Sequence, residues 1–250
     1  MNKVRIGAVS YLNTIPLIYG LQFPPIASKI ELITAYPRKV AMALLENEVD
    51  LGLVPVAILP ELPNYQIVSD FCIGAIDNVE TVCLFSQVPI EDIKTVHLDY
   101  QSRTSIALAR ILLKNYWKIQ PEFVAASPGF ETQISGTNAA VVIGDRTFSL
   151  RKHCNFKYDL ATAWHDWTGL PFIFAAWTAV KELTSEFIQE FNEANKLGLQ
   201  NLDTVIASMP PIDYDLKTYY TQNISYSRTA EKMEGLKLFH RYLAETPMIK

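Results

Sequence analysis

The segment Ser10–Thr14, with the sequence Ser-Tyr-Leu-Asn-Thr, carries polar side chains where a strand is expected to pass into a helix. It follows the apolar stretch Val4–Val9 and precedes Pro16, which suits the first turn of a helix. Either Thr14 or Asn13 suits the N-cap. The first N–H groups of a helix lack internal partners and favour anions, so the segment predicts an anion-binding turn. The alternative is an ordinary capped junction without a ligand.

Two more strand ends predict polar turns. The strand-like segment Thr95–Leu98 is followed by the hydroxyl-rich run Ser102–Ser105 and by apolar residues at helical spacing up to Lys114. The apolar run Ala139–Ile143 ends at Gly144-Asp145. Ligands gather at the carboxyl ends of strands in open α/β sheets, so these turns are candidate site walls.

Short apolar strands alternate with amphipathic helices in the N-terminal part of the chain. This alternation predicts an α/β fold built from parallel strand-helix-strand units. The C-terminal part predicts two further helices. The expected strands here are Ile30–Thr34 and Leu51–Val54, and the expected helices are Pro16–Leu21, Arg38–Glu46, Ser185–Leu197 and Ala230–Leu243.

Composition excludes several classes of protein. Of the 250 residues 49% are hydrophobic and 19% are charged, and the net charge of −4 offers no basic surface for nucleic acid. No apolar run is long enough to cross a bilayer, and polar residues interrupt the only candidate signal peptide, so we expect a cytoplasmic protein without membrane contact. Three cysteines and four histidines show no metal-ligand spacing. We expect no metal and no cofactor.

The polar turns together resemble one known family, the chorismate dehydratases of the futalosine route to menaquinone. The first turn matches as Ser-Tyr-Leu-Asn-Thr-x-Pro-Leu from residue 10, and three further stretches follow in the same order and spacing. These are Leu98-Asp99-x-x-Ser102-Arg103-Thr104-Ser105, Ile143-Gly144-Asp145, and Tyr158-Asp159-Leu160 with Trp164 and residues 168–172.

The resemblance implies a two-lobed fold like that of periplasmic binding proteins of the second type, with mainly parallel central sheets and a substrate cleft between the lobes. We place the chain crossings near residues 86–89 and 172–174. Lobe one is then expected to combine residues 1–86 with 174–250, and lobe two to comprise residues 87–173. The oligomeric state is not predicted.

The activity that the resemblance implies is a hydro-lyase reaction. Chorismate loses water and becomes 3-[(1-carboxyvinyl)oxy]benzoate, and no cofactor is required. The matched motifs offer no His or Glu as base, so the favoured hypothesis has the substrate's own enolpyruvyl carboxylate remove the proton, while Asn13 and Thr81 orient it and stabilise charge. Asp145 is the alternative base. The expected substrate-binding residues are Ser10, Tyr11, Ser102, Thr104, Ser105, Gly144 and Asp145.

The chain departs from the family pattern before Thr81. The family usually has a Gly-Pro-Val-x-Ser-Val-like stretch there, and this chain has Asp77-Asn78-Val79-Glu80-Thr81-Val82. The hydroxyl is kept, but the shape and charge of the loop are changed.

Two other functions stay open. One is an intracellular binding protein of the same fold that holds a small dicarboxylate. The other is the sister enzyme of the pathway, which makes 1,4-dihydroxy-6-naphthoate and begins with a Ser-Pro-Cys-Pro-Asn-Asp type motif. The Ser-Tyr-Leu-Asn start favours the dehydratase.

Overall fold

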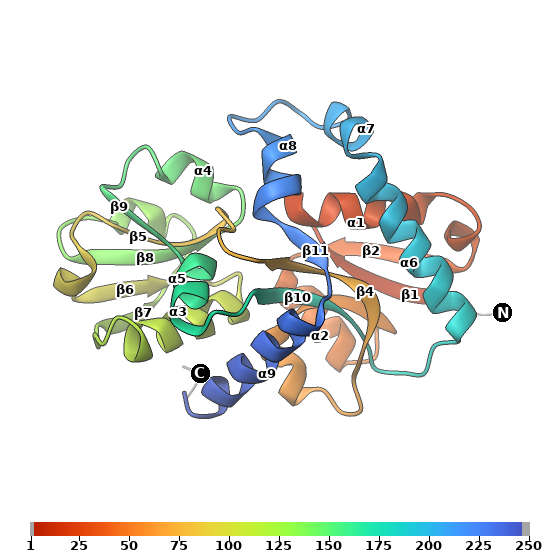
Figure 1. Cartoon of the computed structure of the whole chain (residues 1–250), viewed down its shortest axis with the longest axis horizontal. Coiled ribbons are helices and arrows are strands. Elements are labelled where there is room, and N and C mark those ends of the chain that lie inside the picture. Colours follow the sequence, from red (N-terminus) through yellow and green to blue (C-terminus); the bar gives the residue numbers. More distant parts are fainter. Residues whose placement is uncertain (1–2, 247–250) are drawn as a thin grey trace. The chain divides into compact units, whose positions relative to one another are not determined.

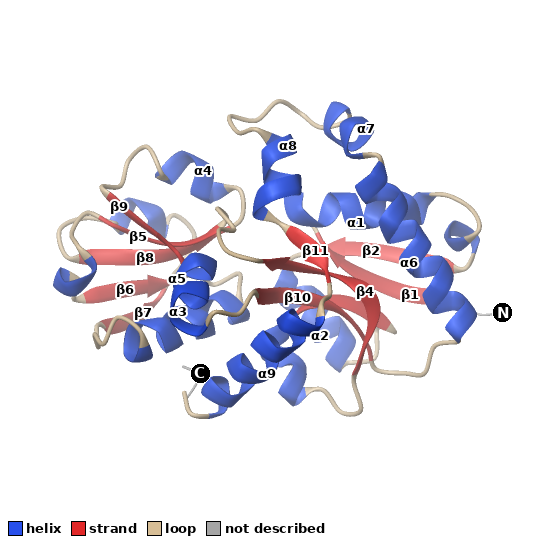
Figure 2. Cartoon of the chain, in the orientation of Figure 1, coloured by secondary structure: helices blue, strands red, loops and turns tan. Residues whose placement is uncertain are grey.

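A computed structural model describes residues 3–246, and the chain forms two compact units, each with one sheet (Figures 1 and 2). Unit 1 comprises Met1–Gly74 and Ile173–Ala230. Unit 2 comprises Ala75–Phe172 and Glu231–Lys250. The chain therefore passes from one unit to the other three times.

The sheet of unit 1 has six strands in the order β11-β4-β10-β3-β1-β2. Strand β1 is parallel to both β2 and β3, whereas β10 runs antiparallel to β3 and β11 antiparallel to β4. The bounds are β1 Val4–Val9, β2 Ile30–Ala35, β3 Leu51–Pro55, β4 Gln66–Ala75, β10 Phe172–Ala179 and β11 Ser225–Ser227.

The helices of unit 1 pack on this sheet and on each other. Helix α2 packs against β1 and β3, and α1 packs along α6 (Figure 1). The bounds are α1 Ile15–Tyr19, α2 Pro37–Leu45, α6 Ser185–Gln200, α7 Leu202–Ala207 and α8 Leu216–Thr218. A π-helical turn, Tyr219–Asn223, follows α8 directly.

The sheet of unit 2 has five strands in the order β7-β6-β8-β5-β9. Strand β6 is parallel to β7 and β8, and β5 is antiparallel to β8 and β9. The strands are β5 Val82–Ser86, β6 Thr95–Leu98, β7 Glu122–Ala125, β8 Asn138–Ile143 and β9 Phe156–Asp159, and the helices are α3 Arg103–Asn115, α4 Arg146–Leu150, α5 Leu160–Thr168 and α9 Ala230–Ala244.

The predicted α/β class and the predicted strands and helices are confirmed, but the expectation of mainly parallel sheets is wrong, because both sheets are mixed. The reason lies in the strands that follow the chain crossings. Strand β5 starts at the edge where β8 ends, since Val82 pairs with Ile143, and β10 likewise starts beside the end of β3. A strand that enters at the carboxyl edge must run against its neighbours.

The unit boundaries differ from the predicted ones in two places. The first crossing falls at Gly74 rather than near residue 86, because β5 belongs to the sheet of unit 2. The second difference is α9, which was expected in lobe one. Its Phe239 is fully buried against the rings of Trp164 and Phe172 in unit 2, at centroid distances of 6.4 and 5.1 Å.

A buried carboxylate at the start of β3, paired with two exposed cations, makes the stability of unit 1 depend on pH. The Asp50 carboxylate accepts from the backbone N–H of Arg5 at 2.9 Å and from its guanidinium at 2.8 Å, and lies 3.0 Å from the Lys181 amine. Burial alone would raise the pKa of Asp50, but the bonds from Arg5 and Lys181 outweigh it and lower this pKa to about 2. The ionised carboxylate therefore stabilises the fold.

We expect Asp50→Asn to lower the free energy of unfolding by about 1–2 kcal/mol at pH 7, a figure reduced for the exposure of both cations. Because the folded-state pKa is depressed, this stabilisation is present above pH ~4 and is lost as the pH falls toward 2. Urea unfolding of both proteins between pH 7 and pH 3 measures it. A difference in stability that does not shrink with falling pH would contradict the assignment.

Candidate functional site

The turn after β1 is a 3-10 turn, η1 Leu12–Thr14, that leads straight into α1. Thr14 occupies the predicted N-cap position of α1, but its backbone is helical (φ −87°, ψ −27°) and its side chain makes no capping hydrogen bond. The Thr14 N–H donates to the Tyr11 carbonyl at 3.0 Å, and the Ser10 N–H donates to the Ala35 carbonyl at 3.1 Å. Two of the N–H groups that were expected to meet an anion are thus already used.

Two tyrosine hydroxyls from the C-terminal part of unit 1 hold this turn. The Tyr220 hydroxyl donates to the Leu12 carbonyl at 3.0 Å, and the Tyr226 hydroxyl donates to the Asn13 carbonyl at 2.9 Å. Both tyrosines are buried, and burial raises the pKa of Tyr226 well above its usual value, so its proton stays in place at neutral pH. Sequence reasoning missed both residues because they lie more than 200 positions away along the chain.

The Asn13 side chain remains available to a ligand. Its Oδ1 accepts from the Thr14 hydroxyl at 3.3 Å, and within residues 3–246 its amide nitrogen has no hydrogen-bond acceptor. Asn13 and Tyr11 are half-buried, and Ser10 is exposed. The turn therefore presents an amide donor on a backbone that other residues hold in place.

In unit 2, four chain segments meet at one edge of the sheet. Strands β6 and β8 end there, β5 begins there, and β9 ends there, because Leu98 pairs with Val141 and Cys83 with Asp159. This edge carries Asp99, Gly144, Thr81 and Asp159, one from each segment. The sheet thus brings together most of the matched motifs of this unit.

The hydroxyl-rich run after β6 forms the N-terminus of α3. Ser102 is the N-cap and accepts from the Ser105 N–H at 3.1 Å, and its hydroxyl donates to the Ser105 hydroxyl at 2.9 Å. Ser102, Thr104 and Ser105 are all buried. Helix capping explains the serine at position 102. Contact of Ser102, Thr104 and Ser105 with a substrate stays a prediction.

Asp99 ties the ends of β6 and β8 together. Its fully buried carboxylate accepts from the Ile143 N–H at 3.1 Å, from the Gln101 N–H at 3.0 Å, and from the guanidinium of Arg146. Burial raises the pKa of Asp99, and Arg146 and the two N–H donors partly offset this. Arg146 also pairs with Glu131 at 2.7 Å. Asp99 therefore has a structural role in this matched motif, because its carboxylate joins the ends of two strands.

Gly144 and Thr81 are joined directly. The Gly144 N–H donates to the Thr81 carbonyl at 2.9 Å, and Gly144 has φ +68°, which favours glycine. Thr81 is buried, and its hydroxyl lies 3.4 Å from the Val79 carbonyl. Asp145 follows Gly144 and its side chain is exposed. Desolvation by the surrounding protein raises the pKa of Asp145 to about 6, and the positive charge of neighbouring Arg146 partly offsets this.

Asp159 holds the loop before β5 by hydrogen bonds to its backbone. Its Oδ2 accepts from the N–H groups of Val79 and Glu80 at 3.1 and 2.7 Å, and its Oδ1 accepts from those of Ala161 and Thr162 at 2.9 and 3.2 Å. Burial raises its pKa to about 6, and the four donors partly offset this. The sequence singled out Asp159 only as a motif position and not as an anchor of this loop.

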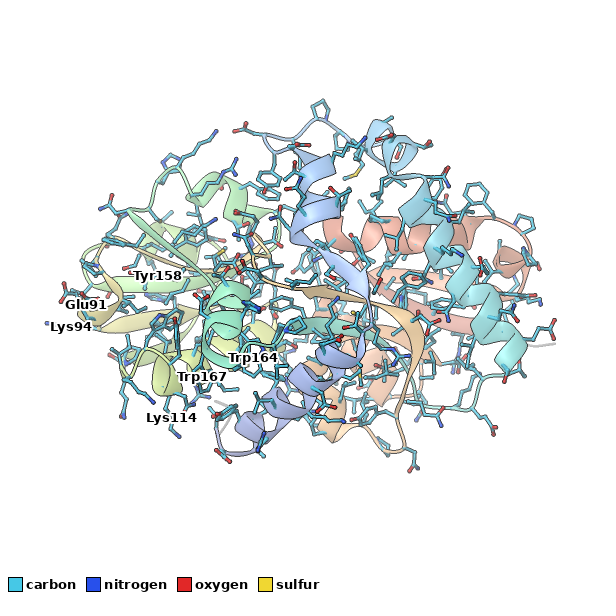
Figure 3. The ribbon with its side chains drawn as sticks, in the orientation of Figure 1. Glu91, Lys94, Lys114, Tyr158, Trp164 and Trp167 are labelled. Carbon is cyan, nitrogen blue, oxygen red and sulfur yellow. The ribbon has the colours of Figure 1, made fainter. Side chains whose placement is uncertain are left out.

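Of the aromatic residues near α5, Trp164 belongs to the core, and Trp167 and Tyr158 are half-buried. Trp164 is fully buried and contacts Trp167 and Phe172 at centroid distances of 5.9 and 5.4 Å. Figure 3 shows Trp164 and Trp167 on α5 and Tyr158 on β9. The contact between Trp164 and Phe172 packs α5, the helix that Asp159 caps, against the start of β10.

Within residues 3–246, no helix has the length and apolar character that a membrane span needs. The same residues contain no grouping of three or more His, Cys, Asp or Glu side chains suited to a metal ion.

Solved structures share this architecture. A Candida albicans protein described as having the generic periplasmic binding protein fold aligns with a TM-score of 0.64 and 12% identity, covering 100% of this chain and 92% of its own. The chain therefore has a periplasmic-binding-protein-like fold. The family model for menaquinone biosynthesis matches residues 4–245, so the chain belongs to that family of biosynthetic enzymes.

Two curated relatives cover nearly the whole chain. A chorismate dehydratase of Thermus thermophilus is 26% identical in an alignment 262 positions long, gaps included, that covers 96% of this chain and 94% of the relative. A chorismate dehydratase of Campylobacter jejuni is 25% identical over 244 residues, which cover 93% and 94%.

Proposed function

We propose that the chain is a chorismate dehydratase, which converts chorismate to 3-[(1-carboxyvinyl)oxy]benzoate and water. The observation that carries this proposal is the similarity, over more than nine-tenths of the chain, to two relatives named for that activity. The Ser-Tyr-Leu-Asn turn supports it, because it resembles the start of the dehydratases and not the Ser-Pro-Cys-Pro-Asn-Asp type start of the naphthoate-forming sister enzyme.

In this proposal the reaction needs no side chain of the protein as its base. The ring carboxylate acidifies the proton at the ether-bearing carbon, and loss of that proton and of the neighbouring hydroxyl forms one molecule of water and an aromatic ring. The enolpyruvyl side chain keeps its ether bond. In our proposal its carboxylate takes the ring proton, so the enzyme's task is to hold that carboxylate in the reactive orientation.

Asn13 is proposed to supply this orientation. Its amide nitrogen is available and the backbone carbonyls of Leu12 and Asn13 are fixed by Tyr220 and Tyr226, so the donor is positioned before substrate arrives. A positioned donor stabilises charge that develops in the transition state without reorganising. Ser10 and Tyr11 flank Asn13 and are proposed as substrate contacts.

In unit 2 the proposal assigns substrate contacts to the edge of the sheet. The residues are Ser102, Thr104, Ser105, Gly144 and Asp145, with Thr81 as a second orienting group. Asp145 remains the alternative base, since a raised pKa makes a carboxylate more basic.

The activity test is direct. Purified protein incubated with chorismate should form an aromatic product lighter than chorismate by one water, without release of pyruvate, and prolonged EDTA treatment should leave the rate unchanged. Ultraviolet absorbance and mass spectrometry follow the product. Binding of chorismate without turnover would instead identify a binding protein, and loss of activity that added zinc or magnesium restores would reject cofactor independence.

A further inference from the structure

One carboxylate in unit 2 connects two segments that are far apart in the sequence. Asp159 accepts four backbone N–H groups, two from Val79 and Glu80 before β5 and two from the first turn of α5. It is buried, with only 7% of its surface exposed. Oδ1 takes two backbone donors, and Oδ2 takes two backbone donors and the Cys83 thiol at 3.8 Å, so both carboxylate oxygens are used.

Capping alone does not explain this arrangement. An N-cap needs one side-chain oxygen that accepts from the second and third N–H groups of the helix, and serine, threonine or asparagine supplies it. Only a carboxylate offers a second acceptor oxygen on the opposite side. The bonds to Val79 and Glu80 are therefore an additional role, separate from the stability of α5.

The loop that receives these bonds is under backbone strain. Glu80 adopts φ +64°, a left-handed conformation that is unfavourable for a residue other than glycine. The N–H of Glu80 is held by Asp159 at 2.7 Å, and its side chain is held by Lys157 at 2.7 Å and by Asn78 at 3.1 Å. Several contacts thus impose one conformation on this loop.

This conformation determines where Thr81 and Gly144 lie. Thr81 follows Glu80 directly, and its carbonyl accepts from the Gly144 N–H at 2.9 Å. A change at Glu80 is therefore transmitted through one peptide unit and one hydrogen bond to the end of β8. Both ends of this path carry residues of the proposed site.

We propose that Asp159 is a positioning residue, which sets the Thr81–Gly144 corner through its bonds to the loop at Val79 and Glu80. The kinetic part of this inference rests on the proposed dehydratase activity. The structural part does not.

The test uses a variant that keeps the cap and loses the loop bonds. In Asp159→Ser a hydroxyl can still cap α5 but is too short to reach Val79 and Glu80, and Asp159→Asn keeps one acceptor oxygen in case the serine variant does not fold. The matched control is Asp215→Ser, because Asp215 caps α8 by accepting from Lys217 and Thr218 and holds no second loop by its carboxylate.

We expect Asp159→Ser to lower kcat by about 10–100-fold with a smaller change in KM, since misplacement of reacting groups by an ångström can cost that much. Amide hydrogen exchange should accelerate at Val79, Glu80 and Gly144 and stay slow within α5. Asp215→Ser should leave kcat within about twofold of the wild type.

Two results would overturn the inference: wild-type kcat in a folded Asp159 variant, or unchanged exchange at Gly144 when exchange at Val79 and Glu80 is faster. A wild-type protein that does not turn over chorismate would reject the proposed function instead. The exchange at Gly144 would still decide whether Asp159 holds the corner.

Discussion

Replacing Asn13 with alanine should lower kcat on chorismate by roughly 10²–10³, the scale seen when one positioned transition-state donor is removed. The fold should be kept, because Tyr226 bonds to the backbone carbonyl of Asn13 and not to its side chain. The side chain also caps no helix. KM should change much less than kcat.

Asn13→Asp is the matched control for shape. It keeps the size of the side chain, removes the N–H donor and adds a negative charge beside an anionic substrate, so its loss of kcat should be at least as large. Single-turnover kinetics combined with thermal unfolding measures both variants. Wild-type turnover together with a lowered melting temperature would end the catalytic assignment.

The second large effect is expected at Gly198, where α6 touches α1. A Cβ atom at Gly198 would lie 1.8 Å from the Pro16 carbonyl oxygen, and one at Gly20 would lie 1.9 Å from the Ala194 carbonyl oxygen. Backbone thus meets backbone at both points, with no flexible side chain that could move aside. The helix α1 held in this way begins immediately after the Asn13 turn.

We expect Gly198→Ala to destabilise the protein by about 2–4 kcal/mol, because inserting atoms into a packed contact typically costs 1–3 kcal/mol and this contact cannot yield locally. Helix propensity alone predicts the opposite sign, since alanine is favoured over glycine by about 1 kcal/mol inside a helix. Urea unfolding measures the change, with Gln200→Ala on the exposed side of α6 as the neutral control. Equal or greater stability of Gly198→Ala would contradict the backbone contact.

The local sequence pattern was sufficient to predict those elements whose structure depends only on residues close together in the chain. The apolar run Ala139–Ile143 is β8 apart from one added residue, and the strand Thr95–Leu98 is β6. Ser102 caps α3 as its position before an amphipathic stretch indicates. These elements depend on side-chain periodicity and on caps within a few residues, which are visible along the chain.

The failures have a common cause. Thr14 makes no capping hydrogen bond because it also ends a 3-10 turn, whose backbone Tyr220 and Tyr226 hold from far along the chain. Helix α9 was expected in lobe one but lies in unit 2. The apolar face of the helix does not reveal in the sequence that Phe239 packs on Trp164.

Local sequence patterns were enough to predict the α/β class and most element boundaries. They also contain the motifs by which the chain resembles menaquinone-biosynthesis enzymes. The folded chain was needed to show the direction of β5 and β10 and the unit that α9 joins. It was also needed to show that Tyr220 and Tyr226 hold the Ser10–Thr14 turn and that Asp159 holds the loop before β5. The two groups of features differ in how far apart in the sequence their interacting residues lie. Periodicity and capping act over a few residues, whereas these hydrogen bonds and ring contacts join segments about 70 to more than 200 positions apart, which only the folded chain brings together.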